Sequence, residues 1–167
     1  MIEEALRRTA KRVLDLCRAR GLHIATAESC TGGLVVAALT EIAGSSDVVD
    51  SGLVTYSNAA KQKLLGVPAA TLTRYGAVSR ETAAAMAKGA LKNSPADLAV
   101  AITGIAGPGG GSKRKPAGLV YFAAASRDGR RLARRRRYGK IGRTRVRLRA
   151  VAEALALLET LAENTPD

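Results

Sequence analysis

The chain has 167 residues, of which 47% are hydrophobic but only 3% aromatic, so we expect one domain over 1–167 with a core of Ala, Val, Leu and Ile. Its two cysteines do not make a disulfide framework, and no signal peptide or membrane-length apolar run occurs, so we expect a cytoplasmic protein without a membrane partner. The formal net charge of +13 favours anionic partners such as nucleotides or nucleic acid, but it does not bear on the fold.

Predicted helices alternate with predicted strands along the chain. Amphipathic spacing and end signals predict helices over 2–20, 34–44, 59–65, 80–92 and 142–162. Apolar runs predict strands over 22–27, 51–57, 98–103, 118–125 and 131–138, the last one antiparallel after a hairpin turn at 127–129. Asn58 and Ser79 are the expected N-caps of the third and fourth helices, 45–50 is expected to be a loop, and 69–78 a connection.

This order of elements predicts an α/β fold, a three-layer α/β/α sandwich with a mixed, mostly parallel sheet. Ligands of such folds bind beyond the carboxyl ends of the strands. Three turns leave strand ends there, at 28–33, 57–61 and 104–112. We therefore search these turns for chemistry.

The first turn joins a strand to a helix and contains Ser29. Backbone N–H groups lack partners at a helix N-terminus, and the helix dipole favours negative charge there. Ser29 can cap this helix, or it can attack a carbonyl while the backbone N–H groups of Cys30, Thr31, Gly32 and Gly33 hold the oxyanion. Cys30 is the rival nucleophile, since a helix N-terminus is expected to lower the pKa of its thiol.

A serine nucleophile needs a base. The single His, His23, lies about six residues and roughly 20 Å of extended chain from Ser29, which makes it a poor candidate for the base. Lys61 is the better candidate, because it falls in the first turn of a helix, where the dipole disfavours a second positive charge, and burial adds to this effect. Lys63 faces elsewhere on that helix. Tyr56, near the end of the second strand, is a candidate to hydrogen-bond the nucleophile or to relay a proton.

The glycine-rich segment 104–112 does not match the phosphate-binding loop or the dinucleotide fingerprint. It can bring backbone N–H groups close to an anion, or it can be a flexible surface loop. No His, Cys, Asp and Glu cluster has the spacing of metal ligands, so nothing in the sequence requires a metal or another cofactor.

Twelve Lys and Arg residues between 127 and 149 are opposed by a single Asp. The simplest interpretation is a solvated hairpin and helix face. Alternatively, one or two of these arginines hold a substrate phosphate. Nucleic-acid binding is a weaker alternative, because no nucleic-acid motif and few aromatic side chains are present.

Five stretches in fixed order carry a family resemblance. They are Glu28-Ser-Cys-Thr-Gly-Gly33, Thr55-Tyr-Ser-Asn-Ala-Ala-Lys61, Leu64-Leu-Gly-Val67, Gly76-Ala-Val-Ser79 with Glu81, and Thr103-Gly-Ile-Ala-Gly-Pro-Gly-Gly-Gly111 followed by Lys115-Pro116. Together they resemble the CinA C-terminal domain family, which includes nicotinamide-nucleotide amidases. The resemblance covers about residues 3–160 and is to the stand-alone form, without the molybdopterin-binding-like domain of long CinA proteins.

The resemblance implies hydrolysis of the carboxamide of nicotinamide mononucleotide, a small pyridine nucleotide, to nicotinic acid mononucleotide and ammonia. It implies Ser29 and Lys61 as the catalytic pair, with Tyr56 as a third member, and a homodimer or larger assembly. The residues expected to position the ribose, the pyridinium ring or the phosphate are Asn58, Thr103, Gly104, Gly107 and one of Arg143 and Arg147.

The start of the last helix departs from the family pattern Phe-x-Gly-Asp-Arg. Arg143 and Arg147 fit the two family arginines, but Gly142 stands near the place of the Asp, and Lys113-Arg114 makes the glycine loop more basic. The alternative function is a non-catalytic module that binds nucleotides or associates with DNA, in keeping with family links to competence and DNA damage. Steep salt dependence without dependence on Ser29 would identify it.

Overall fold

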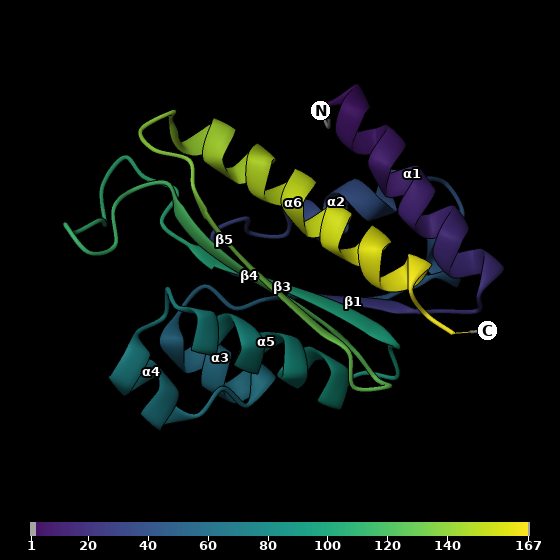
Figure 1. The fold of residues 1–167 in the computed structure, drawn as a ribbon, viewed down its shortest axis with the longest axis horizontal. Helices are drawn as coiled ribbons and strands as arrows, with labels where there is room; N and C mark the ends of the chain where they lie inside the picture. Colours follow the sequence, from purple (N-terminus) through teal and green to yellow (C-terminus); the bar gives the residue numbers. More distant parts are fainter. Residues whose placement is uncertain (1–2, 167) are drawn as a thin grey trace.

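The computed structural model describes residues 3–166, and its strands form one five-stranded sheet in the order β2-β1-β3-β4-β5 (Figure 1). The elements in chain order are α1 (Glu4–Ala19), β1 (Ile24–Glu28), α2 (Leu34–Thr40), the 3₁₀ turn η1 (Ser45–Asp47), β2 (Val49–Val54), α3 (Asn58–Leu65), α4 (Ala69–Tyr75), α5 (Arg80–Lys92), β3 (Leu98–Gly104), β4 (Leu119–Ser126), β5 (Arg131–Arg137) and α6 (Arg143–Glu163). β1 runs parallel to β2 and β3, whereas β4 runs antiparallel to β3 and β5. The predicted α/β sandwich is confirmed.

The two faces of the sheet carry side chains of different size. Leu98, Val100 and Ile102 of β3 point to the face covered by α1, α2 and α6, whereas Ala99 and Ala101 point to the face covered by α3, α4 and α5 (Figure 1). All five side chains are buried, as the continuous apolar run in the sequence predicts for a central strand. Small side chains on the second face let α5 pack close to the sheet.

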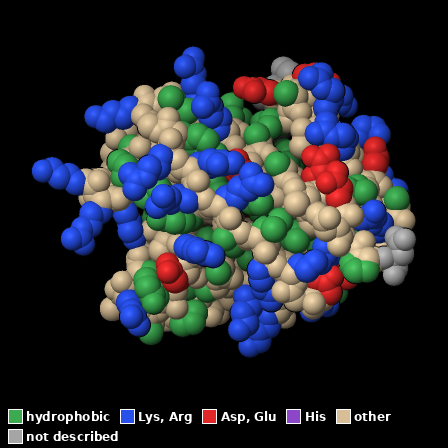
Figure 2. Space-filling model, in the orientation of Figure 1, with side chains coloured by type: hydrophobic (Ala, Val, Ile, Leu, Met, Phe, Trp, Pro, Cys, Tyr) green, Lys and Arg blue, Asp and Glu red, His purple; other side chains and the backbone are tan. Residues whose placement is uncertain are grey.

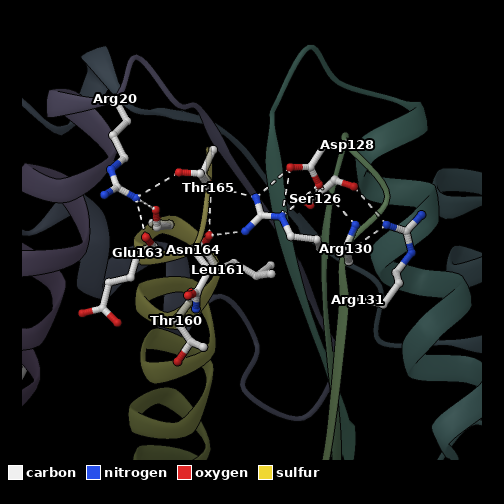
Figure 3. Close-up of polar contacts among 11 residues, drawn as sticks. Arg20, Ser126, Asp128, Arg130, Arg131, Thr160, Leu161, Glu163, Asn164 and Thr165 are labelled. Atoms are coloured by element: carbon white, nitrogen blue, oxygen red, sulfur yellow. Dashed lines mark hydrogen bonds and ion pairs between the residues drawn. The ribbon is translucent and has the colours of Figure 1, made fainter. Parts of the chain in front are cut away.

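Two arginines from separate elements anchor the C-terminal end of α6 (Figure 3). Arg20, which follows α1, donates hydrogen bonds to the backbone oxygens of Ala162 and Glu163. Arg130, in the β4–β5 turn, donates to the backbone oxygen of Leu161 at 2.9 Å and to the hydroxyl of Thr165 at 2.8 Å. The last carbonyl groups of a helix lack intrahelical partners and carry partial negative charge, so both contacts stabilise α6.

Some predicted boundaries are wrong. Residues 69–75 form α4 instead of part of a connection, because Pro68 has the extended backbone conformation of an N-cap, with φ −61° and ψ 135°, so a new helix can begin directly after it. Ser57, not Asn58, is the N-cap of α3, and its side chain accepts a hydrogen bond from the Ala60 N–H at 3.0 Å. The second helix ends at Thr40 rather than residue 44, and β2 already begins at Val49 within the predicted loop.

No helix within residues 3–166 is both long enough and apolar enough to cross a lipid bilayer.

Candidate functional site

The turn between β1 and α2 is held by the buried carboxylate of Glu28. This carboxylate accepts backbone hydrogen bonds from Gly33 at 3.0 Å, Val35 at 3.1 Å and Val36 at 2.9 Å. Glu28 therefore satisfies N–H groups at the start of α2 that would otherwise lack partners, and its negative charge complements the helix dipole. Sequence analysis assigned no role to Glu28, because it lies five residues before Gly33, the N-cap of α2, and is not at a usual capping position.

Ser29 follows Glu28 in the chain and lies beside the C-terminal part of β3, since its backbone N–H donates to the backbone oxygen of Ile102 at 2.9 Å. Its side chain does not cap α2, because the capping groups come from Glu28. Instead, Ser29 Oγ accepts a hydrogen bond from Lys61 Nζ at 3.1 Å. The structure thus brings together Ser29 and Lys61, which lie in separate turns and which sequence analysis predicts to act as nucleophile and base.

Lys61 is among the largest side chains that are almost completely buried, with 1% of its surface exposed. Its Nζ also donates to the backbone oxygen of Thr55 at 2.7 Å, and none of the ion pairs within residues 3–166 includes it. Burial lowers the pKa of Lys61 below its ordinary value, because the charged form loses hydration without gaining a carboxylate. Lys63 is exposed, as expected.

The competing candidates do not have suitable environments. His23 is exposed at the opposite end of β1, with its Nδ1 3.4 Å from Asp97. Burial raises the pKa of the Cys30 thiol to about 11, so the expectation that the helix N-terminus lowers it is wrong. The cost of desolvating a buried thiolate exceeds the benefit of the helix dipole. Cys30 thus stays protonated near neutral pH.

A cavity of about 270 Å³ opens above Ser29 and Lys61, just below the usual size range of small-molecule pockets. Its lining includes expected site residues from the regions of the three turns and from the start of α6, namely Ser29, Cys30, Tyr56, Lys61, Thr103, Gly104, Gly107 and Arg143. The glycine loop is therefore a wall of the same pocket. Thr103 is fixed in this wall by a hydrogen bond from its hydroxyl to the Ala77 oxygen at 2.6 Å.

Arg143 and Tyr56 meet across this pocket. Arg143 donates one hydrogen bond to the Tyr56 hydroxyl at 2.8 Å and another to the Gly107 oxygen at 3.0 Å. The Tyr56 hydroxyl therefore pairs with Arg143, and the expected hydrogen bond between Tyr56 and the nucleophile is not formed in this structure. With 60% of its surface exposed, Tyr56 lies near the entrance.

Two residues expected to bind substrate lie outside the residues that line the cavity. Asn58 is exposed in the first turn of α3. Arg147 is directed to the β1–α2 turn, where it donates to the backbone oxygens of Cys30 at 3.1 Å and Thr31 at 2.9 Å. Arg147 thus holds the turn that carries Ser29, a role that depends on the packing of α6 and that its sequence position did not reveal.

Not all the predicted oxyanion donors are available. The Gly32 N–H donates to the Ser29 oxygen at 3.0 Å, and the Gly33 N–H to Glu28. Apart from regular helix and strand hydrogen bonds, the backbone N–H groups of Cys30 and Thr31 donate to no backbone acceptor within residues 3–166. No cluster of three or more His, Cys, Asp and Glu side chains within the same range could hold a metal ion.

Comparisons with known proteins agree with this architecture. The model of the CinA C-terminal domain family matches residues 6–162. The crystal structure of competence/damage inducible protein CihA from Agrobacterium tumefaciens superposes with a TM-score of 0.95 at 55% identity, covering 96% of this chain and 98% of that one.

Two relatives of similar length are named nicotinamide-nucleotide amidohydrolase PncC. The protein of Escherichia coli strain K12 is 46% identical over 166 residues, 99% of this chain and 100% of its own. That of Enterobacter agglomerans is 47% identical over 155 residues, 93% and 94% of the two chains. The chain spans only 28% of a longer relative, the CinA-like protein of Geobacter sulfurreducens, at 56% identity. The chain therefore belongs to the CinA C-terminal domain family.

Proposed function

We propose that the protein hydrolyses the carboxamide of nicotinamide mononucleotide to nicotinic acid mononucleotide and ammonia, with Ser29 as nucleophile and Lys61 as general base. The observation that carries this proposal is the buried Lys61 amine, with its lowered pKa, 3.1 Å from the Ser29 hydroxyl. The names and nearly full-length similarity of the two PncC relatives support the substrate.

The Thr55 carbonyl supports the role of Lys61 as a base. A neutral amine has two N–H donors and one lone pair. When one N–H donates to the Thr55 oxygen, 2.7 Å away, the lone pair can face Ser29 and accept its hydroxyl proton. Ser29 Oγ then attacks the carboxamide carbon. The positive pyridinium ring of the bound substrate further favours the neutral form of Lys61.

The backbone N–H groups of Cys30 and Thr31 are the proposed oxyanion donors, since those of Gly32 and Gly33 are engaged within the turn. One such donor typically contributes about 3–4 kcal/mol to the transition state. Protonated Lys61 then delivers its proton to the departing ammonia, which leaves an acyl ester on Ser29. Water hydrolyses this ester, again with Lys61 as base.

The rest of the nucleotide is proposed to occupy the cavity walls formed by Tyr56, Thr103, Gly104 and Gly107. Arg143 is the proposed phosphate ligand, because its guanidinium group matches the geometry of phosphate oxygens and its side chain lines the cavity. Arg143 would exchange its contact with the Tyr56 hydroxyl for the phosphate.

The test is ammonia release from nicotinamide mononucleotide in the presence of a chelator, by wild type, Ser29→Ala and Lys61→Met. We expect both variants to lose at least about 10³-fold in kcat while still binding the nucleotide, since each removes a member of one catalytic unit. Lys63→Ala, on the exposed side of the same helix, is the matched control and should retain wild-type turnover. Near-normal turnover by Ser29→Ala would overturn the mechanism.

A further inference from the structure

The β5 strand forms one edge of the sheet, and its arginines are divided between the two faces. Arg134 and Arg136 point to the α6 face, where both pair with Glu153 at 3.1 and 2.8 Å. Because side chains alternate along a strand, Arg131, Ala133 and Arg135 point to the α5 face. The arginines of β5 therefore have different surroundings, and Arg131 and Arg135 on the α5 face form no ion pair with an acidic side chain within residues 3–166.

The backbone N–H and C=O groups of Arg131, Ala133 and Arg135 face outward from this edge of the sheet. At one end of the β4–β5 ladder the Ser126 N–H donates to the Arg130 oxygen at 3.0 Å, and at the other the Tyr138 N–H donates to the Gly118 oxygen at 2.9 Å. Hydrogen-bonded pairs alternate with non-bonded pairs in an antiparallel ladder, so the even-numbered residues of β5 bond to β4. The N–H and C=O groups of Arg131, Ala133 and Arg135 then point away from the sheet.

A groove of about 380 Å³ runs beside this edge, between α5 and β5. Ala84, Ala123 and Ala133 form its apolar floor, and Arg80, Lys88 and Arg131 form its rim. A second hollow of about 240 Å³, which shares Arg80 and Ala133, continues it to Arg135. None of the ion pairs within residues 3–166 includes these four basic residues.

Figure 2 shows Lys and Arg side chains spread over this view of the molecule, whereas most acidic side chains visible there lie towards α1. Arginines on an edge strand prevent two identical edges from pairing, because like charges would then lie opposite one another. A second copy of this chain is therefore a poor partner for β5. An acidic strand has the complementary charge.

We propose that β5 and the α5–β5 groove bind an acidic peptide segment, which extends the sheet as an additional strand. The free N–H and C=O groups of Arg131, Ala133 and Arg135 supply the main-chain hydrogen bonds, as in other cases of strand addition. The side-chain spacing defines the segment: two acidic residues four positions apart lie opposite Arg131 and Arg135. An apolar residue midway between them lies over Ala133 and fills the groove.

The probe is a synthetic peptide whose five-residue core has glutamate at both ends, valine in the middle and threonine at the other two positions. A peptide of the same composition, with the glutamates moved to the second and fourth positions, presents its charges on the other face of the strand. Fluorescence anisotropy with the labelled peptides measures binding to the full chain. We expect the first peptide to bind at least tenfold more tightly than the second, with affinity decreasing as salt increases.

Protein variants test the same surface from the other side. Arg135→Glu should weaken binding of the first peptide at least tenfold, whereas Lys11→Glu, an equal charge change on exposed α1, should change it less than twofold. Hydrolysis of nicotinamide mononucleotide by Arg135→Glu should match wild type, so this test is independent of the proposed enzymatic activity. Equal binding of both peptides would overturn the proposal, and so would the binding of neither. It would also be overturned if a single-stranded oligonucleotide bound more tightly than the first peptide and Arg135→Glu did not weaken that binding.

Discussion

Gly89 of α5 determines how closely α3 approaches, and α3 carries Lys61. A methyl group added at Gly89 would overlap the backbone oxygen of Leu65, and it would lie 2.7 Å from the carbonyl carbon of Leu65 and 3.0 Å from its Cα. Non-bonded carbons are most stable at about 3.5–4.0 Å, so Gly89→Ala requires α3 to move away by at least about 1 Å. Lys61 lies one helical turn before Leu65, and the same movement would stretch its 3.1 Å hydrogen bond to Ser29 beyond the usual limit.

We therefore expect Gly89→Ala to lower kcat about 10²-fold, the size of effect that a displacement of 1 Å can have on a catalytic group. KM should change less, since the proposed nucleotide contacts come from other elements. Overpacking costs about 1–3 kcal/mol, whereas the higher helix propensity of Ala restores about 1 kcal/mol. The free energy of unfolding should thus stay level or fall by up to about 2 kcal/mol. Steady-state kinetics and urea unfolding measure these effects.

The matched control is Ala84→Gly, at an exposed position of the same helix. It should lose about 1 kcal/mol of stability through helix propensity but keep the wild-type kcat. This control separates a loss of stability from a displacement of Lys61. If Gly89→Ala were more stable than wild type and equally active, the argument that Gly89 sets the position of α3 would be wrong.

Three further predictions concern the site and its support. First, kcat/KM should rise with pH as Lys61 loses its proton, with a midpoint below 10.5, and a midpoint at or above 10.5 would contradict the burial argument. Because burial lowers the pKa of Lys61 in the folded protein, the charged side chain destabilises the fold at pH values below that pKa, and this destabilisation disappears as the pH rises towards 10.5. Urea unfolding should therefore show that the gain in the free energy of unfolding of Lys61→Met over wild type is smallest at high pH. Second, the kcat of Cys30→Ala should stay within about tenfold of wild type, because a thiol with a pKa of about 11 is not the nucleophile. Loss of turnover in this variant would make Cys30 a candidate nucleophile again. Third, Arg130→Ala should cost about 1–2 kcal/mol in thermal unfolding through lost contacts to the end of α6. Arg12→Ala, which removes an exposed ion pair, should cost less, and equal losses would argue against the anchoring role of Arg130.

The sequence predicted the parts of the fold that depend on local patterns. The apolar run of β3, the N-cap Ser79 of α5 and the β4–β5 turn each carry a signal within a few residues, and the structure confirms them. α4 was missed because Pro68 was interpreted only as a stop signal. The extended backbone of a proline also suits the N-cap position, so the next helix can begin directly after Pro68.

The candidate site was predictable in outline, because Ser29 and Lys61 follow strands whose ends meet at one edge of the sheet. Its supporting contacts were not. The Thr55 carbonyl reaches Lys61 only through the path of the backbone after β2, and Arg147 reaches the serine turn only through the packing of α6. The Cys30 thiol gave a wrong expectation because burial, which dominates its pKa, is a property of the folded chain.

The carboxylate of Glu28 has a consequence for how a phosphorylated substrate can be oriented. A helix N-terminus after a strand is a frequent docking point for ligand phosphates. Here the protein supplies its own anion at the start of α2, and three backbone N–H groups are already committed to it. We therefore expect the phosphate of the proposed substrate to bind away from the serine turn, and Arg143 is the only arginine among the residues found to line the cavity. The internal anion thus leaves the turn to the carboxamide end of the proposed substrate.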